Sequence, residues 1–566
     1  MITRRDFVKA TAAIGAGAIT GCAISQRGAS QDARPNIVMI LADDLGFECL
    51  GAYGGQSYNT VNIDRLARSG MKFKYCFGTP VCSPARAELL TGRYNFRSGF
   101  IDIAGRSGAV EGLDPTKEIT LANLLQAAGY ATAVTGKWHL GWGNKPTTGP
   151  AEFDPQQYRP SNNIRACGFE QQYCFSGPHI SYGEPIKGQY HPDLYHDWAL
   201  KYLDSQRSQT RPFFLYYALG LPHFEFDPTP LNPQGKKKDK ANFPYMVQYL
   251  DQQVGQIVRK LDELGMRQNT LIVFTGDNGT DQFKSKLNGR EVTGGKSSLK
   301  DTGAWVPLMA SWPGTIRAAS QCDDLTDFTD FLPTLCEIGG AKPPTDRSID
   351  GHSFAPQLRG RQGNAREWVY VQMVNKWFIR DKKYKLRETG RLYDLSNSPF
   401  QEPRIEPKDE TPDAKAAKQK LAGILVAMLA AEGASKRPAA NAKTSAKATV
   451  EKAELELRLP LVTAKNDPVL AELILRNKGK KPLTSGPLRL SLHDSIGQRL
   501  SEKTAGEQKP IEPGKELRLR VNLPQELALQ KIGTYSITCE CDVDGEEMKG
   551  QKKLVVERSA FIVSAS

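Results

Sequence analysis

The 566-residue sequence has no hydrophobic run long enough to cross a membrane as a helix. Its small-residue stretch 10–21 is shorter than the roughly 20 residues that a bilayer requires. Apart from Cys22 and Cys82, the cysteines do not show the spacing of a metal site, and only seven histidines are present. No segment resembles a nucleic-acid-binding module. These absences exclude a membrane-spanning protein, a zinc-finger protein and a nucleic-acid-binding protein.

What is present is the composition of a loop-rich globular protein. Hydrophobic residues make up 39% of the chain, with 51 glycines and 35 prolines. The length allows two or three domains with a large core. The net charge of +13 suits a polyanionic partner, and much of the excess lies in tail and linker segments.

The N-terminus reads as an export signal. Residues 3–9, Thr-Arg-Arg-Asp-Phe-Val-Lys, have the twin-arginine pattern, and the apolar stretch after them ends in Ile-Thr-Gly-Cys22. That ending resembles a bacterial lipobox, which predicts lipidation of Cys22 and membrane attachment only through this anchor. The expected location is the periplasm or the cell surface. Plain cleavage within 25–30, giving a soluble product, is the alternative.

The most informative motif is Cys82-Ser83-Pro84-Ala85-Arg86, followed by Ala-Glu-Leu-Leu-Thr-Gly-Arg. A proline two residues after Cys82 predicts a loop that enters a helix at its first turn. Cys82 would then lie near the positive end of the helix dipole, where anions are favoured, with Arg86 one turn later. By the residues alone, a cysteine that merely adjoins a helix start remains an alternative.

Two apolar, strand-like runs end in oxygen-bearing side chains. Asp43 and Asp44 follow the run 36–42, and Asp277 and Asn278 follow 271–276. Open α/β sheets bind ligands at the carboxyl ends of their strands. Three carboxylates and one amide oxygen suit a hard divalent cation, Ca²⁺ rather than Zn²⁺. For either motif by itself, a solvated turn or helix cap is the alternative.

Two further segments carry basic groups. Lys137 and His139 lie two residues apart in Thr-Gly-Lys-Trp-His-Leu-Gly, and on an extended segment they would project to the same face. A lysine and a histidine aimed at one point suit an anion and a proton transfer. His223 follows Pro222 after the strand-like run 213–218, and its alternative is a surface or capping residue.

In their order along the chain, the motifs resemble those of the type I, formylglycine-dependent sulfatases. These are the arylsulfatase-like members of the alkaline phosphatase superfamily. The resemblance implies that a formylglycine-generating enzyme oxidises Cys82 to formylglycine before export. It implies that Ca²⁺ is bound by Asp43, Asp44, Asp277, Asn278 and the modified position 82. The implied catalytic residues are Cys82, Arg86, Lys137, His139, His223 and Lys296. Among them, His223 with Lys296 is expected to protonate the leaving alcohol, and His139 to accept a proton.

The family's segment around Lys296 is only partly kept. The family pattern reads G-G-K-G, an acidic residue, G-G, an arginine and then V-P, and this chain keeps 294–296 and Val306-Pro307. It departs from the pattern at Ser297, Asp301, Thr302-Gly303 and Trp305. The departures put the surroundings of Lys296 in doubt and are compatible with a subgroup that has its own substrate.

Strand and helix patterns alternate from about 35 to 340, which predicts an α/β sandwich with a mostly parallel sheet. The alkaline-phosphatase-like fold matches this. Predicted strands are 36–42, 131–135, 213–218, 270–275 and 307–311, and a helix is predicted over 245–264. We expect a signal and tether at 1–33, a catalytic domain at 34–360, an antiparallel subdomain at 361–432, a linker at 433–449 and an Ig-like β-sandwich at 450–566.

The predicted function is removal of sulfate from a sulfated carbohydrate or an aryl sulfate. Two alternatives stay open at this point. A phosphate or phosphonate monoester hydrolase can share the fold. A catalytically dead, surface-anchored lipoprotein that binds glycans would also keep the architecture.

Overall fold

The computed structural model describes residues 34–141, 161–175, 190–223 and 226–435, and shorter segments between 453 and 564. The twin-arginine segment, Cys22 and most of the predicted linker lie outside the described residues. Within the described ranges, no helix combines the length and the apolar character that crossing a bilayer needs.

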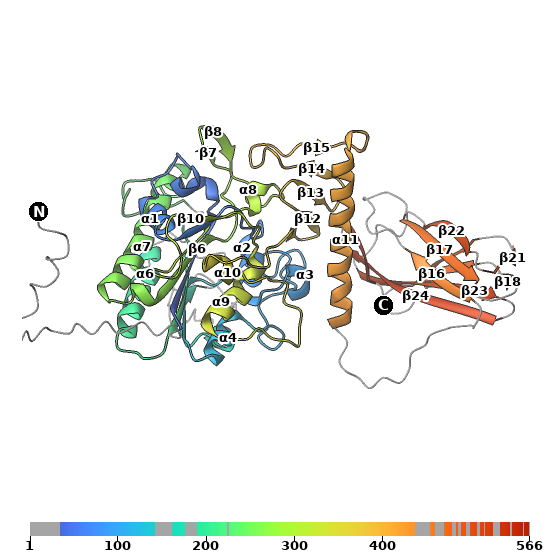
Figure 1. The fold of residues 1–566 in the computed structure, drawn as a ribbon, viewed down its shortest axis with the longest axis horizontal. Helices are drawn as coiled ribbons and strands as arrows, with labels where there is room; N and C mark the ends of the chain where they lie inside the picture. Colours follow the sequence, from blue (N-terminus) through green and yellow to red (C-terminus); the bar gives the residue numbers. More distant parts are fainter. Residues whose placement is uncertain are drawn as a thin grey trace, which may run out of the picture. The chain divides into compact units, whose positions relative to one another are not determined.

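An eight-stranded sheet forms the centre of the catalytic region (Figure 1). In spatial order its strands are β10 (Ser320–Cys322), β2 (Met71–Phe73), β9 (Leu308–Ser311), β6 (Thr270–Gly276), β1 (Asn36–Ala42), β5 (Phe213–Ala218), β3 (Ala131–Lys137) and β4 (Gln171–Phe175). The pairs β1–β5, β1–β6, β3–β5 and β3–β4 are parallel, whereas β9 is antiparallel to both of its neighbours. The predicted α/β class with a mostly parallel sheet is confirmed.

Helices cover both faces of this sheet (Figure 1). One face packs against α1 (Val61–Arg68), α6 (His191–Gln206) and α7 (Phe243–Glu263), and the other against α2 (Cys82–Thr91), α4 (Leu121–Ala127) and α9 (Phe331–Gly339). In β1, Ile37, Met39 and Leu41 face one core, and the residues between them face the other. Burial on both sides explains why the central strands are continuously apolar rather than alternating.

The predicted elements agree closely with the observed ones. The bounds of β1 and β5 match the expected ranges, β3 continues two residues further to Lys137, and α7 begins two residues earlier than predicted. The helical-period residues expected on the inner face of α7 are all buried: Met246, Leu250, Val254, Ile257 and Leu261. Shorter elements are α3 (Asn95–Ser98), α5 (Ser161–Ala166), α8 (Asp301–Ala304), α10 (Ala355–Leu358) and the hairpin of β7 (Lys284–Leu287) and β8 (Arg290–Thr293).

A second, five-stranded antiparallel sheet follows in the chain. It consists of β11 (Val369–Met373), β12 (Lys376–Arg380), β13 (Tyr384–Arg387), β14 (Leu392–Asp394) and β15 (Arg404–Ile405). Helix α11 (Pro412–Ser435) buries Leu421, Leu425 and Met428 in the same apolar cluster as Ile379 of this sheet. The expected antiparallel sheet is therefore present, and α11 packs against it.

The described segments beyond residue 450 are antiparallel strands, as the alternating sequence pattern predicted. One sheet contains β16 (Ala453–Arg458), β17 (Val469–Asn477) and β22 (Glu516–Leu523). A second contains β20 (Arg499–Ala505), β19 (Leu488–His493), β23 (Gly533–Val543), β24 (Glu546–Glu557) and β25 (Ala560–Ser564), and β18 (Leu483–Thr484) pairs with β21 (Pro510–Ile511). The Ig-like assignment stays a prediction.

Candidate active site

The two acidic motifs meet at the carboxyl edge of the central sheet. Because β1 and β6 are adjacent and parallel, with Ala42 opposite Gly276, the residues that follow both strands lie side by side. The backbone N–H of Asp277 donates to the carbonyl of Ala42 at 2.9 Å. The backbone N–H of Asp44 donates to Oδ1 of Asp277 at 3.0 Å.

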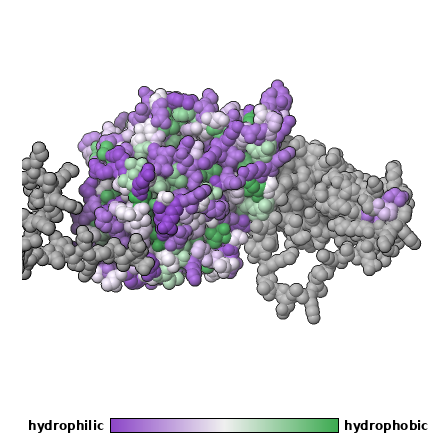
Figure 2. All heavy atoms as spheres, viewed as in Figure 1, coloured by the Kyte–Doolittle hydropathy of each residue, from purple (hydrophilic) through white to green (hydrophobic). Residues whose placement is uncertain are grey.

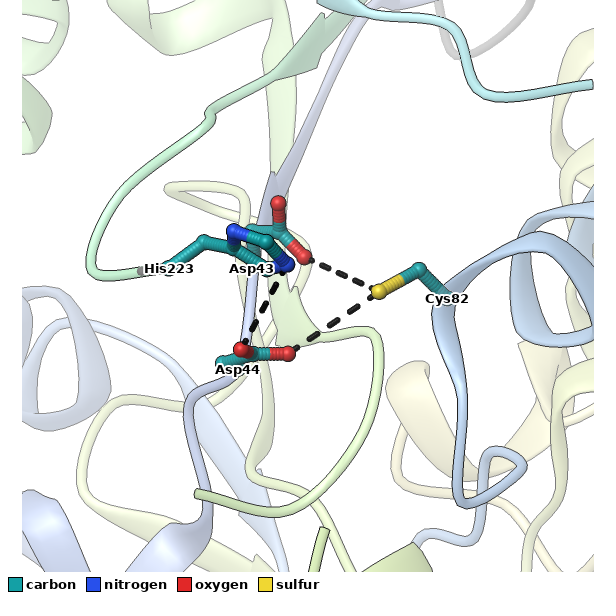
Figure 3. A group of neighbouring side chains, drawn as sticks. All are labelled: Asp43, Asp44, Cys82 and His223. Atoms are coloured by element: carbon teal, nitrogen blue, oxygen red, sulfur yellow. Dashed lines mark hydrogen bonds and ion pairs between the residues drawn. The ribbon is translucent and has the colours of Figure 1, made fainter. Parts of the chain in front are cut away.

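Cys82 faces these carboxylates from the first residue of α2, where the sequence predicted a helix start. Its Sγ lies 3.3 Å from Oδ1 of Asp43 and 3.9 Å from Oδ1 of Asp44 (Figure 3). The side chain is 1% exposed. Burial, reinforced by the negative charge of Asp43, raises the pKa of the Cys82 thiol well above its ordinary value. The unmodified thiol is therefore protonated at neutral pH.

Arg86 connects α2 to two strands of the sheet. Its Nη2 lies 2.8 Å from Oδ2 of Asp277, and its Nη1 donates to the carbonyl of Lys137 at 2.7 Å. The guanidinium is fully buried, so both contacts are made away from water. Arg86 thereby ties α2 to Asp277, which follows β6, and to the end of β3.

Two lysines pair with the two aspartates that follow β1. Nζ of Lys137 lies 2.6 Å from Oδ2 of Asp43, and Nζ of Lys296 lies 2.5 Å from Oδ2 of Asp44. Burial opposes the charge of Asp43, but Lys137 and other nearby positive groups outweigh it and hold the pKa of Asp43 well below its usual range. Burial, with the charge of Asp43, raises the pKa of Asp277 to about 7.

The backbone between β3 and His139 has an unusual course. Gly136 has φ 97°, and a Cβ there would lie 1.8 Å from the carbonyl oxygen of Ala218, so only glycine fits. The extended segment expected through His139 instead ends at Lys137, and His139 itself has a left-handed φ of 55°. A tertiary contact also reaches this residue: the hydroxyl of Ser83 donates to the His139 carbonyl at 2.7 Å.

Both histidines expected in the site lie there in a neutral form. The ring nitrogens of His139 are buried without a hydrogen-bond partner among the described residues, and burial together with Lys137 lowers the pKa of His139 well below its usual value. His223 lies after β5, with Nε2 3.8 Å from Oδ2 of Asp44. Burial and Lys137 lower the pKa of His223 to about 4.

The donor atoms at this edge fit a hard cation. Asp43, Asp44, Cys82 and His223 each offer one atom, and these atoms lie within 4.8 Å of one another (Figure 3). Oδ1 of Asn278 is buried and accepts no hydrogen bond among the described residues, while its Nδ2 donates to Oδ1 of Asp44 at 2.7 Å. A buried oxygen without a donor, beside carboxylates, is the environment of an oxygen-ligated divalent ion.

The structure also shows what surrounds Lys296, which the sequence left in doubt. Ser297 has a left-handed φ of 61° at the position where the family pattern has glycine, and its N–H donates to the carbonyl of Pro80 at 2.9 Å. Asp301 is buried, hydrogen-bonded to Arg380 of β12 and 2.7 Å from Nζ of Lys385 of β13. The small sheet therefore anchors the segment that carries Lys296.

Trp305, the other departure, fills an aromatic cluster. Its ring stacks on Phe47 with centroids 4.3 Å apart, and its Nε1 donates to the carbonyl of Lys74 at 3.0 Å. Trp305 thus has a packing role. The sequence did not reveal the contacts of Ser83, Arg380 and Lys385. Each of these residues contacts a residue far away in the chain, and no local pattern marks such a contact.

Fold and site together define an α/β protein with carboxylates, basic side chains and one cysteine buried together at the carboxyl edge of its central sheet. The family described as Sulfatase matches residues 35–341, which hold every expected catalytic and metal-binding residue. The chain belongs to the sulfatase family and is a sulfuric ester hydrolase.

Individual relatives agree with this assignment. N-acetylgalactosamine-6-sulfatase of Canis lupus familiaris is 31% identical over 371 residues, covering 60% of this chain and 68% of the relative. Arylsulfatase A of Homo sapiens is 32% identical over 384 residues, covering 62% of this chain and 74% of the relative. The crystal structure of Ps i-CgsB in complex with k-i-k-neocarrahexaose has a TM-score of 0.56 and 25% identity, covering 72% of this chain and 94% of that one.

Proposed function

We propose that this sulfatase removes sulfate from a sulfated carbohydrate or an aryl sulfate, using formylglycine made from Cys82 and a bound Ca²⁺. The observation that carries the proposal is the position of Cys82. Its Sγ, at the start of α2, lies 3.3 Å from the Asp43 carboxylate. Asp43 and Asp44 in turn are paired with Lys137 and Lys296. A reacting group at this position would meet both the cation and the cationic side chains that bind a sulfate.

Modification of Cys82 supplies what the thiol lacks. A buried thiol with a raised pKa is a poor nucleophile, because the thiolate is the reactive form. Oxidation to the aldehyde, followed by hydration, would provide a hydroxyl nucleophile at the same position. We expect a formylglycine-generating enzyme to carry out this oxidation in the cytoplasm, since the twin-arginine route exports folded protein.

The residues that would hold Ca²⁺ are Asp43, Asp44, Asp277 and Asn278, together with position 82. Asp277 already accepts hydrogen bonds from Arg86 and from the Asp44 N–H, which orients its carboxylate. Three carboxylates face three cationic side chains, so a divalent cation would leave the site positively charged and favour an anionic ester. Such a cation would polarise a sulfate oxygen and lower the pKa of a bound hydroxyl.

The protein's own groups then divide the remaining tasks. Lys137 and Lys296 lie where they can contact the sulfate oxygens and offset their charge. We assign protonation of the leaving alcohol to His223 with Lys296; an anionic ester beside His223 would raise its pKa from the low value of the free site. His139, neutral and with its ring nitrogens unpaired among the described residues, is our candidate for accepting a proton from position 82.

We further propose that the enzyme acts outside the cytoplasm, held at the membrane by a lipid on Cys22. The twin-arginine pattern and the lipobox support this. The net charge of +13 supports a polyanionic substrate. The crystal structure of Ps i-CgsB, which has a similar fold, is a complex with k-i-k-neocarrahexaose, and this supports a carbohydrate substrate here.

The deciding experiment combines intact-peptide mass spectrometry with turnover. Conversion of Cys82 to the aldehyde replaces one sulfur and two hydrogens by one oxygen, lowering the peptide mass by about 18 Da. Protein coexpressed with a formylglycine-generating enzyme should show this shift and hydrolyse p-nitrophenyl sulfate repeatedly. Cys82→Ser should fold but fail to turn over, and normal multiple turnover by that variant would refute the proposed nucleophile.

The same preparation separates the alternatives. Matched sulfate, phosphate and phosphonate esters of p-nitrophenol report on reaction class, and we expect the sulfate ester to have the highest kcat/KM. A faster phosphate or phosphonate ester would favour the monoester hydrolase. A wholly unconverted thiol after coexpression, with glycan binding but no turnover, would favour the dead lipoprotein.

A further inference from the structure

The loop that follows His223 presents a concentrated positive charge at the surface. Lys236, Lys237, Lys238 and Lys240 lie within five residues, and all four are exposed. The only acidic residue among them, Asp239, uses its side chain to accept a hydrogen bond from the backbone N–H of Ala241 at 2.9 Å. With four lysines and this one aspartate, the segment 236–240 has a net formal charge of +3.

Buried side chains fix the backbone of this loop. The amide of Asn242, 1% exposed, donates to the carbonyls of Phe226 and Lys236, both at 2.7 Å, and accepts from Nδ2 of Asn232 at 3.0 Å. Oδ1 of the buried Asp227 accepts from the N–H of Lys238 at 3.0 Å. Because the loop is already ordered, binding a ligand here would cost little backbone entropy.

The loop is joined to the active site from two sides. Phe226 lies three residues after His223, so its Cα is within about 11 Å of the histidine Cα. Its ring packs on Phe283 with centroids 5.2 Å apart, and Nζ of Lys240 lies 5.5 Å from the centre of the same Phe283 ring. The carbonyl of Phe283 accepts from the N–H of Gly294 at 2.9 Å, two residues before Lys296.

We propose that the lysine loop 236–240 binds further sulfate groups of a polyanionic chain, next to the sulfate that reacts; this rests on the proposed function. Lys137 and Lys296 are mostly buried and serve the reacting group, so exposed lysines outside can reach only groups beyond it. Large apolar side chains are rare on the described surface, and the face in Figure 2 is mostly hydrophilic. Binding of a substrate by charge therefore fits the lysine loop better than binding on an apolar surface.

The test is competition against hydrolysis of p-nitrophenyl sulfate. Two inhibitors are compared: a short dextran sulfate of defined length and glucose 6-sulfate, which has a single sulfate. In the variant K236Q/K237Q/K238Q/K240Q we expect the Ki of dextran sulfate to rise about tenfold, since four exposed ion pairs each contribute a small favourable term. The Ki of glucose 6-sulfate and kcat/KM for the aryl sulfate should stay within about twofold of wild type.

Two matched variants separate a subsite from general charge. Replacing the same four lysines by arginine keeps the charge and should keep the wild-type Ki. Replacing Lys408, Lys415, Lys418 and Lys420, at or near α11, by glutamine removes equal charge and should leave the Ki unchanged. Equal loss in this control, or a wild-type Ki in the loop variant, would overturn the proposal.

Failure of the subsite can be distinguished from failure of the proposed function. If the wild-type enzyme hydrolyses no sulfate ester, the proposed function fails, and the loop is judged by calorimetry with the same dextran sulfate. Weaker binding by the loop variant than by the α11 control would then still support an anionic subsite. Equal binding by the two would reject it.

Discussion

The hydroxyl of Ser83 donates a hydrogen bond of 2.7 Å to the backbone carbonyl of His139. The residue directly after Cys82 thereby holds a second site residue, which lies 56 positions later and has a left-handed φ of 55°. A non-glycine residue in this region of φ is strained and persists only where its surroundings hold it. The contact joins the start of α2 to the backbone of His139.

Ser83→Ala should therefore lower kcat strongly and lower the free energy of unfolding only slightly. Without the hydroxyl, the His139 backbone can relax, and we expect kcat on p-nitrophenyl sulfate to fall about tenfold with little change in KM. Thr91→Val is the matched control, because it removes another buried hydroxyl of α2 that donates within the helix, to the carbonyl of Ala87. Both variants should lose about 1 kcal/mol of unfolding free energy. Equal kcat values for the two variants would show that Ser83 is only structural.

Removal of divalent metal should abolish activity and lower Tm, with both restored by Ca²⁺. The reason is that Asp43 and Asp44 approach each other in a buried site, where a cation relieves their repulsion. In Asn278→Ala, which removes the buried unpaired oxygen, the Ca²⁺ concentration for half-maximal activity should rise at least about tenfold. The exposed Asp262→Asn should leave it unchanged. A chelator-treated enzyme with full activity would contradict the metal assignment.

Removing one partner of the buried pair of Asp301 and Arg380 should destabilise the protein strongly. Arg380→Met leaves a buried carboxylate with only part of its compensation, and we expect a loss of about 3 kcal/mol in the free energy of unfolding measured by urea. The double variant with Asp301→Asn should be less destabilised than the two single losses added together. Arg404→Met, which breaks an exposed pair with Glu406, should cost less than about 1 kcal/mol. If the losses of the two single variants add up to the loss of the double variant, Asp301 and Arg380 are not directly coupled.

His196 should make stability fall in mild acid. It bridges β5 and α7, with Nδ1 2.7 Å from the Tyr217 hydroxyl and Nε2 2.5 Å from Oε1 of Gln256. Burial lowers its pKa to about 4 in the folded state, against about 6.5 when unfolded. The unfolded chain therefore binds the extra proton between these values, and stability that is present above pH 6.5 is lost as the pH falls toward 4.

This dependence is measured by urea unfolding of the wild type and of His196→Phe. From pH 7 to pH 5 the wild type should lose about 2 kcal/mol more than the variant, which cannot take up this proton. The stability gap between the two proteins should thus narrow in acid. A gap that does not depend on pH would mean that His196 titrates normally.

The class of fold could be predicted from sequence patterns, and the motifs supplied the candidate site residues. Continuous apolar strands such as 36–42 and the helical period of α7 arise from burial on both faces of one sheet, a local property of pattern. The acidic pairs after β1 and β6 could be placed together because parallel strands share one carboxyl edge.

How these residues are held is visible only in the folded protein. The left-handed backbone of His139, the Ser83 contact and the anchoring of Asp301 by Arg380 and Lys385 join segments that are far apart in the chain. Such contacts depend on packing geometry, which no local periodicity records. The same holds for the lysine loop, whose charge the sequence displays but whose link to the segments of His223 and Lys296 runs through the packing of Phe226 on Phe283.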